Sequence, residues 1–255
     1  MRITNTSGRM TVLSYKSKSG GAVLKFQSVK QTKTYAEIVG QISKLIEQGE
    51  LEPGERLPSE RTLSSALNIG RQSLREALSV LEAIGLLEVR HGIGTFVRQD
   101  AVSNLTTIPK EDESLMNPFE LLEARRVIEV ELVSLAAKRA TEQEIEEMEK
   151  ALEALKNNLD EGQHAFELDR KVHLAFARGA KNEILYRTML EITNQMSKHL
   201  WTIMKEKSLE VLGRGEKYHK EHEKIFNAIK SRDSKMATHA MLEHLKNIER
   251  AFLQR

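Results

Sequence analysis

From residue 35 onward, apolar residues recur at the three- and four-residue spacing of an amphipathic helix in most segments, and one short β-prone stretch departs from this pattern. Before residue 86 the spacing predicts three short helices, over 35–46, 59–67 and 70–84. The departure follows them, where the β-prone runs LLEVR and GTFVR are joined by His-Gly-Ile-Gly at 91–94, which indicates a hairpin. The sequence therefore predicts a mainly α protein with a single small hairpin.

Beyond residue 116 the pattern is purely helical. Six further helices are expected, over 117–139, 141–161, 164–179, 182–207, 215–231 and 234–253. Their short connections predict an all-α antiparallel bundle over 117–253. A polar linker, 99–116, containing Pro109, separates it from the first domain, which we place at 34–98.

Composition agrees with this fold and limits the chemistry. The chain is 40% apolar and 30% charged, as expected for a soluble globular protein, and has no cysteine. Without cysteine it has neither disulfides nor thiolate metal sites, which is typical of a reducing cytoplasm. No apolar run approaches the roughly 18 residues of a membrane span. We therefore expect a cytoplasmic protein without membrane contact.

Charge is distributed unevenly. Residues 1–33 carry seven Lys or Arg and no acid, whereas residues 34–100 carry seven against ten Asp or Glu. The first segment is rich in Ser, Thr and Gly and has no clear helical period, so we expect a disordered tail or an over-extended start. A basic transit peptide and a phosphate-contacting arm are the alternatives.

The order helix, helix, tight turn, helix, hairpin is that of a winged helix-turn-helix. The third helix has polar side chains at its start and an apolar face behind them, as a helix that enters the DNA major groove requires. The expected DNA-binding residues are Arg61, Arg71, Gln72, Ser73, Arg75, His91, Gly92 and Gly94. A small helical domain with merely solvated arginines is the alternative.

The bundle places histidines among apolar residues. His173 follows Asp169 by four residues, so both lie on one helical face, and His222 and His244 lie on the apolar faces of two other helices. Buried imidazoles and carboxylates need partners, and one divalent metal would satisfy all four groups. Ordinary hydrogen-bonded core histidines are the alternative.

The N-terminal segment LEPGERLPSERTLSSALNIGRQSLREALSVLEAIGLLEVRHGIGTFV closely resembles the DNA-binding domain of the GntR family of bacterial transcription regulators. The resemblance covers residues 34–98. It departs from the family at Gly70, where serine usually precedes the first recognition arginine. This substitution puts a side-chain cap or a phosphate contact in doubt.

The bundle resembles the FCD effector domain of the FadR-like branch of that family over residues 117–250. ELDRKVHLAFARGAKN, EHEKIFNAIKSRD and AMLEHL carry the resemblance. It implies that Asp169, His173, His222 and His244 hold a metal, which we expect to be Zn²⁺, with Mn²⁺ or Ni²⁺ as alternatives. It also implies a small organic acid as effector.

Other residues compete for these roles. Arg125 matches a family arginine and is expected to bind an effector carboxylate, although a salt bridge with Glu129 is the alternative. Trp201 is either a wall of the effector pocket or a core residue. His199 and His219 also face inward and are alternative ligands, whereas His164 and His239 are expected at the surface.

The resulting hypothesis is a ligand-responsive transcription regulator that binds a palindromic DNA operator as a homodimer. Repression is the expected direction of control. One alternative is a regulator whose metal is purely structural. The other is a metal-dependent hydrolase fused to a DNA-binding head. The sequence shows no general base beside the expected ligands, so we expect no enzymatic activity.

Overall fold

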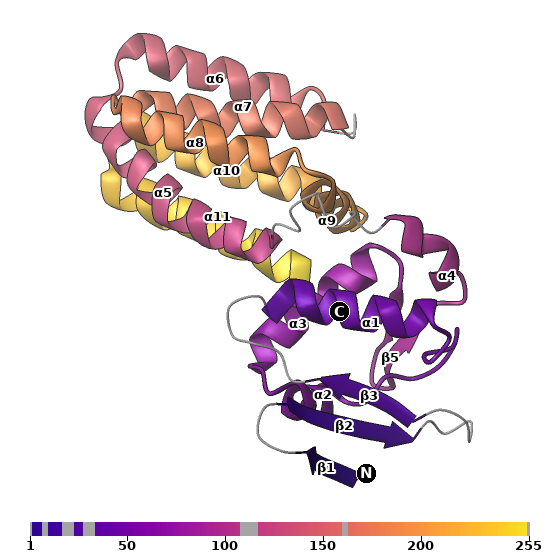
Figure 1. The fold of residues 1–255 in the computed structure, drawn as a ribbon. Coiled ribbons are helices and arrows are strands. Elements are labelled where there is room, and N and C mark those ends of the chain that lie inside the picture. Colours follow the sequence, from indigo (N-terminus) through magenta and orange to yellow (C-terminus); the bar gives the residue numbers. More distant parts are fainter. Residues whose placement is uncertain are drawn as a thin grey trace. The chain divides into compact units, whose positions relative to one another are not determined.

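The computed structural model describes residues 2–6, 10–16, 23–27, 34–107, 117–159 and 163–253. The chain forms two compact units (Figure 1). One comprises Met1–Asn117 with Leu253–Arg255, and the other comprises Pro118–Phe252.

The first unit contains the predicted winged helix-turn-helix. Its elements are α1 (Thr34–Glu47), α2 (Glu60–Leu67), α3 (Arg71–Ala83), β4 (Leu87–Arg90) and β5 (Gly94–Val97). Both α1 and α2 pack against α3. The apolar positions of the three helices form the core, where Ile38, Ile42, Leu63, Leu67, Leu74 and Leu78 are at most 1% exposed. The helical periodicity thus predicts the burial of these side chains correctly.

Local hydrogen bonds define the turn between α2 and α3. Ser59 caps α2, because its Oγ accepts from the Thr62 amide at 3.2 Å. The helix ends at Asn68, whose backbone is left-handed (φ 56°). Ser64 Oγ then donates to the Ile69 carbonyl at 2.7 Å. These contacts set the path of the chain into α3.

The wing is the antiparallel pair of β4 and β5, in which Leu87 pairs with Val97 and Arg90 with Gly94. Gly94 has φ 143°, and a Cβ atom there would lie 2.6 Å from Arg56 Nε. The positive φ favours glycine at this position, and the Arg56 guanidinium lies close against it.

The structure differs from the expected disordered tail. It contains β1 (Arg2–Thr6), β2 (Met10–Lys16) and β3 (Val23–Gln27), which form an antiparallel sheet in the order β1-β2-β3. These segments are rich in Thr, Val, Leu, Tyr and Phe, which favour strands. The missing helical period, on which the expectation of disorder rests, does not exclude a strand with an alternation of period two.

The expected linker is also partly ordered. It begins with α4 (Ala101–Asn104) and the 3₁₀ helix η1 (Leu105–Thr107). Ala101 is fully buried, and Asn104 Nδ2 donates to the Gly85 carbonyl at 3.0 Å. These contacts hold the start of the linker on the helix-turn-helix unit. Residues 108–116, with Pro109, lie outside the described residues.

The second unit is the predicted helical bundle. Its helices are α5 (Pro118–Arg139), α6 (Glu142–Lys156), α7 (Gln163–Gly179), α8 (Glu183–Met196), α9 (His199–Leu209), α10 (Arg214–Lys230) and α11 (Ser234–Leu253). The helix expected over 182–207 is therefore two helices. Lys198 has an extended backbone (ψ 149°), and Ser197 Oγ donates to the Asn194 carbonyl at 2.7 Å. Neither glycine nor proline marks this break.

Helix α7 packs against α5, α6 and α8, and α10 packs against α5, α6 and α9. Side chains on the inner faces of α5, α7 and α10 can therefore meet inside the unit. Among the helices of the described residues, none is both long enough and apolar enough to cross a membrane.

Candidate DNA-binding face and metal centre

The first turns of α3 present polar side chains to solvent. Arg71, Gln72 and Arg75 are exposed and Ser73 is half-buried. Leu74, on the opposite side of the helix, is fully buried. The helix thus has the polar start and apolar back that the sequence predicted.

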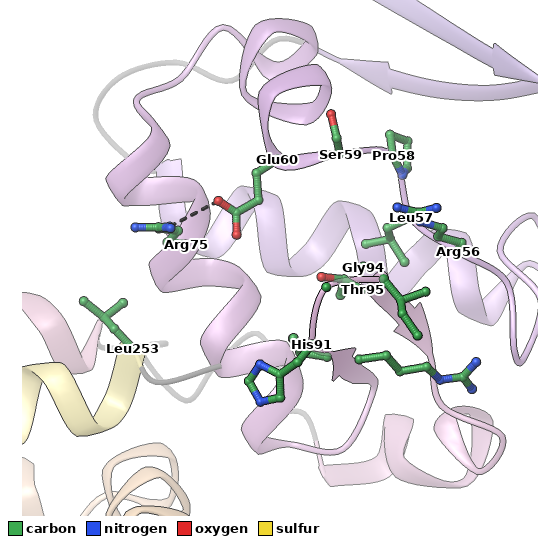
Figure 2. A pocket seen from close by; sticks show the side chains of 14 residues that line it. Arg56, Leu57, Pro58, Ser59, Glu60, Arg75, His91, Gly94, Thr95 and Leu253 are labelled. Atoms are coloured by element: carbon green, nitrogen blue, oxygen red, sulfur yellow. Dashed lines mark hydrogen bonds and ion pairs between the residues drawn. The ribbon is translucent and has the colours of Figure 1, made fainter.

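An ion pair joins the starts of the two helices of the helix-turn-helix. Arg75 Nε lies 3.1 Å from Glu60 Oε2 of α2, as Figure 2 shows. The Arg75 side chain is still 59% exposed. Its guanidinium is therefore oriented by Glu60 and remains accessible to a ligand.

The remaining predicted DNA-binding residues are on α2 and the wing. Arg61 is exposed on α2, and His91 and Gly92 are exposed at the tip of the wing. Gly94 is half-buried and lies beside Arg56. The wing residues line one pocket together with Arg56 and Arg75 (Figure 2).

Sequence reasoning missed Arg56. It is exposed, and its backbone pairs with Phe96 of the wing. This bridge fixes the Arg56 backbone beside the wing, and the guanidinium lies next to Gly94. The only signal is its place in the segment PGERLPSE, whose turn residues predict no more than an extended turn.

Replacing Gly70 by serine is expected to stabilise α3. Gly70 is the N-cap, makes no side-chain cap and has φ −64°, which serine adopts readily. A Cβ atom there meets nothing within 4 Å. We expect Gly70→Ser to raise the free energy of unfolding by about 0.5–1 kcal/mol and to slow amide exchange in the first turn of α3. Gly70→Ala is the control, and an equal gain in both variants would contradict a capping hydroxyl.

Three of the predicted metal ligands meet inside the helical unit. His173 of α7, His222 of α10 and His244 of α11 are each at most 2% exposed. One ring nitrogen from each lies within 4.8 Å of the others, and His173 Nε2 is 3.1 Å from His222 Nε2. Imidazoles from three helices that are far apart in the sequence thus converge on one point.

Two carboxylates hold the outer nitrogens of this cluster. His173 Nδ1 lies 2.5 Å from Glu129 Oε2 of α5, and His244 Nδ1 lies 2.9 Å from Glu221 Oε2. Asn247 Nδ2 in turn donates to Glu221 Oε1 at 2.7 Å. A carboxylate on Nδ1 orients the ring so that Nε2 can face a metal, as in many histidine metal sites. Sequence reasoning missed Glu221, although it directly precedes His222 in the chain.

Burial favours the neutral form of the His222 and His244 imidazoles. It lowers the pKa of His222 and of His244 well below the usual value, and the neighbouring imidazoles of the cluster lower both further. Among the described residues, His244 Nε2 has no hydrogen-bond partner. A neutral, unpartnered ring nitrogen in the interior is suited to bind a metal.

Asp169 lies at the edge of the cluster. Its Oδ1 is 3.6 Å from His222 Nε2, and its Oδ2 is 3.6 Å from Lys205 Nζ of α9. Burial alone would raise the pKa of Asp169, but Lys205 and His222 lower it below the usual range, so the carboxyl is ionised. Lys205 is only 3% exposed and escapes sequence reasoning, because it lies on a helix that carries no motif.

Arg125 of α5 is completely buried beside the cluster. Its Nε lies 2.5 Å from Glu129 Oε1, and its Nη2 lies 3.2 Å from His173 Nε2. Burial alone would raise the pKa of Glu129, but Arg125 and His173 lower it to about 2. The salt bridge considered as an alternative therefore exists, but it lies in the interior and next to the histidines. The Trp201 ring, 5.4 Å from the Arg125 guanidinium carbon, is buried against Phe252.

The other histidines lie outside this cluster. His199 is exposed at the first turn of α9, so the inward orientation expected for it is wrong. The break before α9 changes the direction of that helix relative to the expected continuous one. His219 is buried, and its Nε2 lies 3.3 Å from Glu223 Oε1. His164 and His239 are not buried, in agreement with the expected surface positions.

The donor set fits a divalent transition metal. Two ligands that bind one Zn²⁺ ion at their usual distances lie roughly 3–3.5 Å apart. The separations from His222 Nε2 to His173 Nε2 (3.1 Å) and to Asp169 Oδ1 (3.6 Å) are close to this spacing. Imidazole nitrogens with one carboxylate suit zinc, manganese and nickel.

A winged helix-turn-helix followed by a separate helical unit is the architecture of a DNA-binding protein with a second, all-helical domain. Two family models match the chain: "Bacterial regulatory proteins, gntR family" over residues 34–97 and "FCD domain" over residues 120–247. The chain belongs to the GntR family of transcription regulators and carries an FCD domain.

Similar proteins of known name are regulators. The chain is 32% identical to the HTH-type transcriptional regulator LutR of Bacillus subtilis over 80% of this chain and 94% of that one. It is also 32% identical to the Uxu operon transcriptional regulator of Escherichia coli, over 86% and 87%. A solved GntR structure from Streptococcus agalactiae is 25% identical with a TM-score of 0.45, over 83% and 99%. The two named relatives are transcription regulators, in agreement with the family of this chain.

Proposed function

We propose that the chain is a ligand-responsive repressor whose helical unit binds a divalent metal and a small organic acid. The observation that carries the proposal is the cluster of His173, His222 and His244, which is buried and held from outside by carboxylates. Core histidines satisfied by hydrogen bonds would not leave a buried ring nitrogen without a partner, and among the described residues His244 Nε2 has none.

His173, His222, His244 and Asp169 would hold the ion. Zn²⁺ is the first choice, with Mn²⁺ and Ni²⁺ as alternatives that the same donors accept. When bound, the ion would supply a Lewis-acid position for a ligand oxygen. Glu129 and Glu221 orient two of the imidazoles through their Nδ1 atoms.

Two buried cations support an acidic effector. Among the described residues, Arg125 Nη1 and Lys205 Nζ have no hydrogen-bond partner. Donors of buried charged groups that lack a hydrogen bond are costly, and a carboxylate would satisfy them. Trp201 would form a wall beside Arg125.

A repressor role agrees with one of the relatives. The chain is 31% identical, over 82% of its length, to the HTH-type transcriptional repressor NanR of Klebsiella aerogenes. That protein represses transcription, as its name states, and we extend this direction of control to the present chain.

The DNA-binding half of the proposal is a homodimer on a palindromic operator. Two copies of α3 and of the wing would occupy two half-sites about one helical turn apart. An effector that binds more tightly to the arrangement unable to bind DNA must weaken operator affinity by the same factor. The helical unit would thereby control the two winged helix-turn-helix units of the dimer without contacting DNA itself.

Alanine at Arg71 or Arg75 is expected to weaken operator binding by about 1–3 kcal/mol each, which is roughly 5- to 150-fold. Both guanidinium groups are at the exposed start of α3. The measurement is fluorescence anisotropy on an operator selected from random duplexes by the full-length chain. Arg187→Ala is the control, because this arginine is 73% exposed on α8 and pairs with Glu183. Unchanged operator affinity in both Arg71→Ala and Arg75→Ala would refute the assignment of α3 as the DNA-recognition helix.

A further inference from the structure

Lys205 of α9 is a buried cation whose donors are not satisfied. It is 3% exposed, and its Nζ lies 4.7 Å from the centre of the Tyr218 ring. Asp169 Oδ2 is 3.6 Å from Nζ, which is beyond hydrogen-bond distance. Among the described residues, Nζ has no hydrogen-bond partner. Because an ammonium group has three donors, Lys205 can bind a further acceptor.

Arg125 of α5 is a second buried cation beside the histidine cluster. Its Nη2 lies 3.2 Å from His173 Nε2, and its guanidinium carbon lies 5.4 Å from the ring of Trp201, one helical turn before Lys205 on α9. Arg125 Nη1 has no hydrogen-bond partner in the part of the chain that the structure describes. Burial lowers the pKa of Lys205, Asp169 opposes this effect, and the charge of Arg125 lowers the pKa further. The two cations are therefore close enough to repel each other, and anionic groups beside them would relieve that repulsion.

The buried charges around the cluster balance one another before a metal binds. Among the described residues, they belong to two basic and two acidic side chains: Arg125, Lys205, Asp169 and Glu129. Glu221, which contacts His244, has its own counter-ion in Lys217, with 4.0 Å between Oε1 and Nζ. A divalent metal bound by neutral imidazoles would add two positive charges to this interior. Because buried charges without a counter-ion are costly, the loaded centre favours a ligand with two negative charges.

We infer that the effector is a dicarboxylate, with one carboxylate paired to Arg125 and the second paired to Lys205. The inference rests on the proposed metal and effector site, and it assigns Lys205 as the residue that selects the second carboxylate. A monocarboxylate bound at Arg125 would leave the donors of Lys205 unsatisfied in the interior, which costs affinity. The competing explanation is that Lys205 serves only as the counter-ion of Asp169. In that case the number of carboxylates on the ligand would not matter.

Pairs of acids that differ by one carboxyl group test the inference. Malate is compared with lactate, and succinate with propionate, by isothermal titration calorimetry on full-length protein loaded with Zn²⁺. We expect the dicarboxylate to bind roughly 10- to 100-fold more tightly in at least one pair. Lys205→Met should remove this preference by weakening the dicarboxylate alone, whereas Lys205→Arg should keep most of it. The zinc content is measured after each titration, because a dicarboxylate can also remove the metal by chelation.

Lys198→Met is the matched control, because it removes an exposed lysine at the start of the same helix and should keep the preference. Equal affinity for the two acids of both pairs in the wild-type protein overturns the inference without any variant. A preference that persists in folded, zinc-loaded Lys205→Met overturns it as well, and so does equal weakening of both acids, which would assign Lys205 to Asp169 alone. Failure of the proposed function is distinguishable, because the wild-type protein would then take up no zinc or bind no acid of either class.

Discussion

Alanine at His222 is expected to abolish metal binding. Wild-type protein loaded with Zn²⁺ should hold about one ion per chain by elemental analysis, and His222→Ala should hold almost none. His222 Nε2 lies near two other candidate ligands, 3.1 Å from His173 Nε2 and 3.6 Å from Asp169 Oδ1. Its loss removes the nitrogen that joins the imidazoles to the carboxylate.

Metal binding should also stabilise the folded chain. A ligand present at about 100 to 1,000 times its dissociation constant raises the free energy of unfolding by about 3–4 kcal/mol. Chelation of the metal or His222→Ala should remove this contribution. His219→Ala is the matched control, because His219 is buried one turn earlier on α10 but pairs with Glu223 outside the cluster. Metal loss in the control equal to that in His222→Ala would contradict the assigned ligand set.

Removal of the ion distinguishes a metal that takes part in effector binding from a metal that only stabilises the fold. If the metal takes part in effector binding, stripping it removes the thermal shift that carboxylates such as citrate or glucuronate produce in the loaded protein. If the metal is purely structural, the melting temperature falls and the carboxylate shift persists. The second outcome would contradict a metal-dependent effector site, but it would not contradict the assignment of the chain as a transcription regulator.

Replacing Arg125 by methionine is expected to destabilise the helical unit by about 3–5 kcal/mol. The variant leaves Glu129, which is 2% exposed, as a buried carboxylate without its guanidinium partner. Removing one partner of a buried pair costs more than removing both, so Arg125→Met combined with Glu129→Met should recover part of the loss. The measurement is urea unfolding followed by Trp201, the single tryptophan, which lies in this unit.

The neighbouring arginine provides the control. Arg126 pairs with Glu249, but the two side chains are 27% and 24% exposed. An ion pair that stays partly exposed to solvent contributes about 0–1 kcal/mol to the free energy of unfolding. Arg126→Met should therefore have a small effect on stability. Equal losses for Arg125→Met and Arg126→Met would show that helix packing, and not the buried charge, determines the result.

The groups around the histidine cluster show what local sequence patterns leave undetermined. The sequence suggests Glu129 only as a partner of Arg125, and the structure shows that it contacts His173 as well. Lys205 carries no signal at all, because a lysine on a surface-like helical pattern is ordinarily solvated. Only the packing of α9 near Asp169 buries it.

Helical spacing, caps and turn residues by themselves determined the helix-turn-helix, the wing and the inward faces of most bundle helices. These features depend on contacts between residues a few positions apart, which the sequence displays directly. Tertiary packing alone decided that three imidazoles meet at one point, that Glu221 and Lys205 join them, and that the 182–207 segment breaks before α9. These outcomes depend on the relative placement of elements that are distant in the chain. That placement is determined by the free energy of long-range packing contacts, which a local sequence pattern does not show.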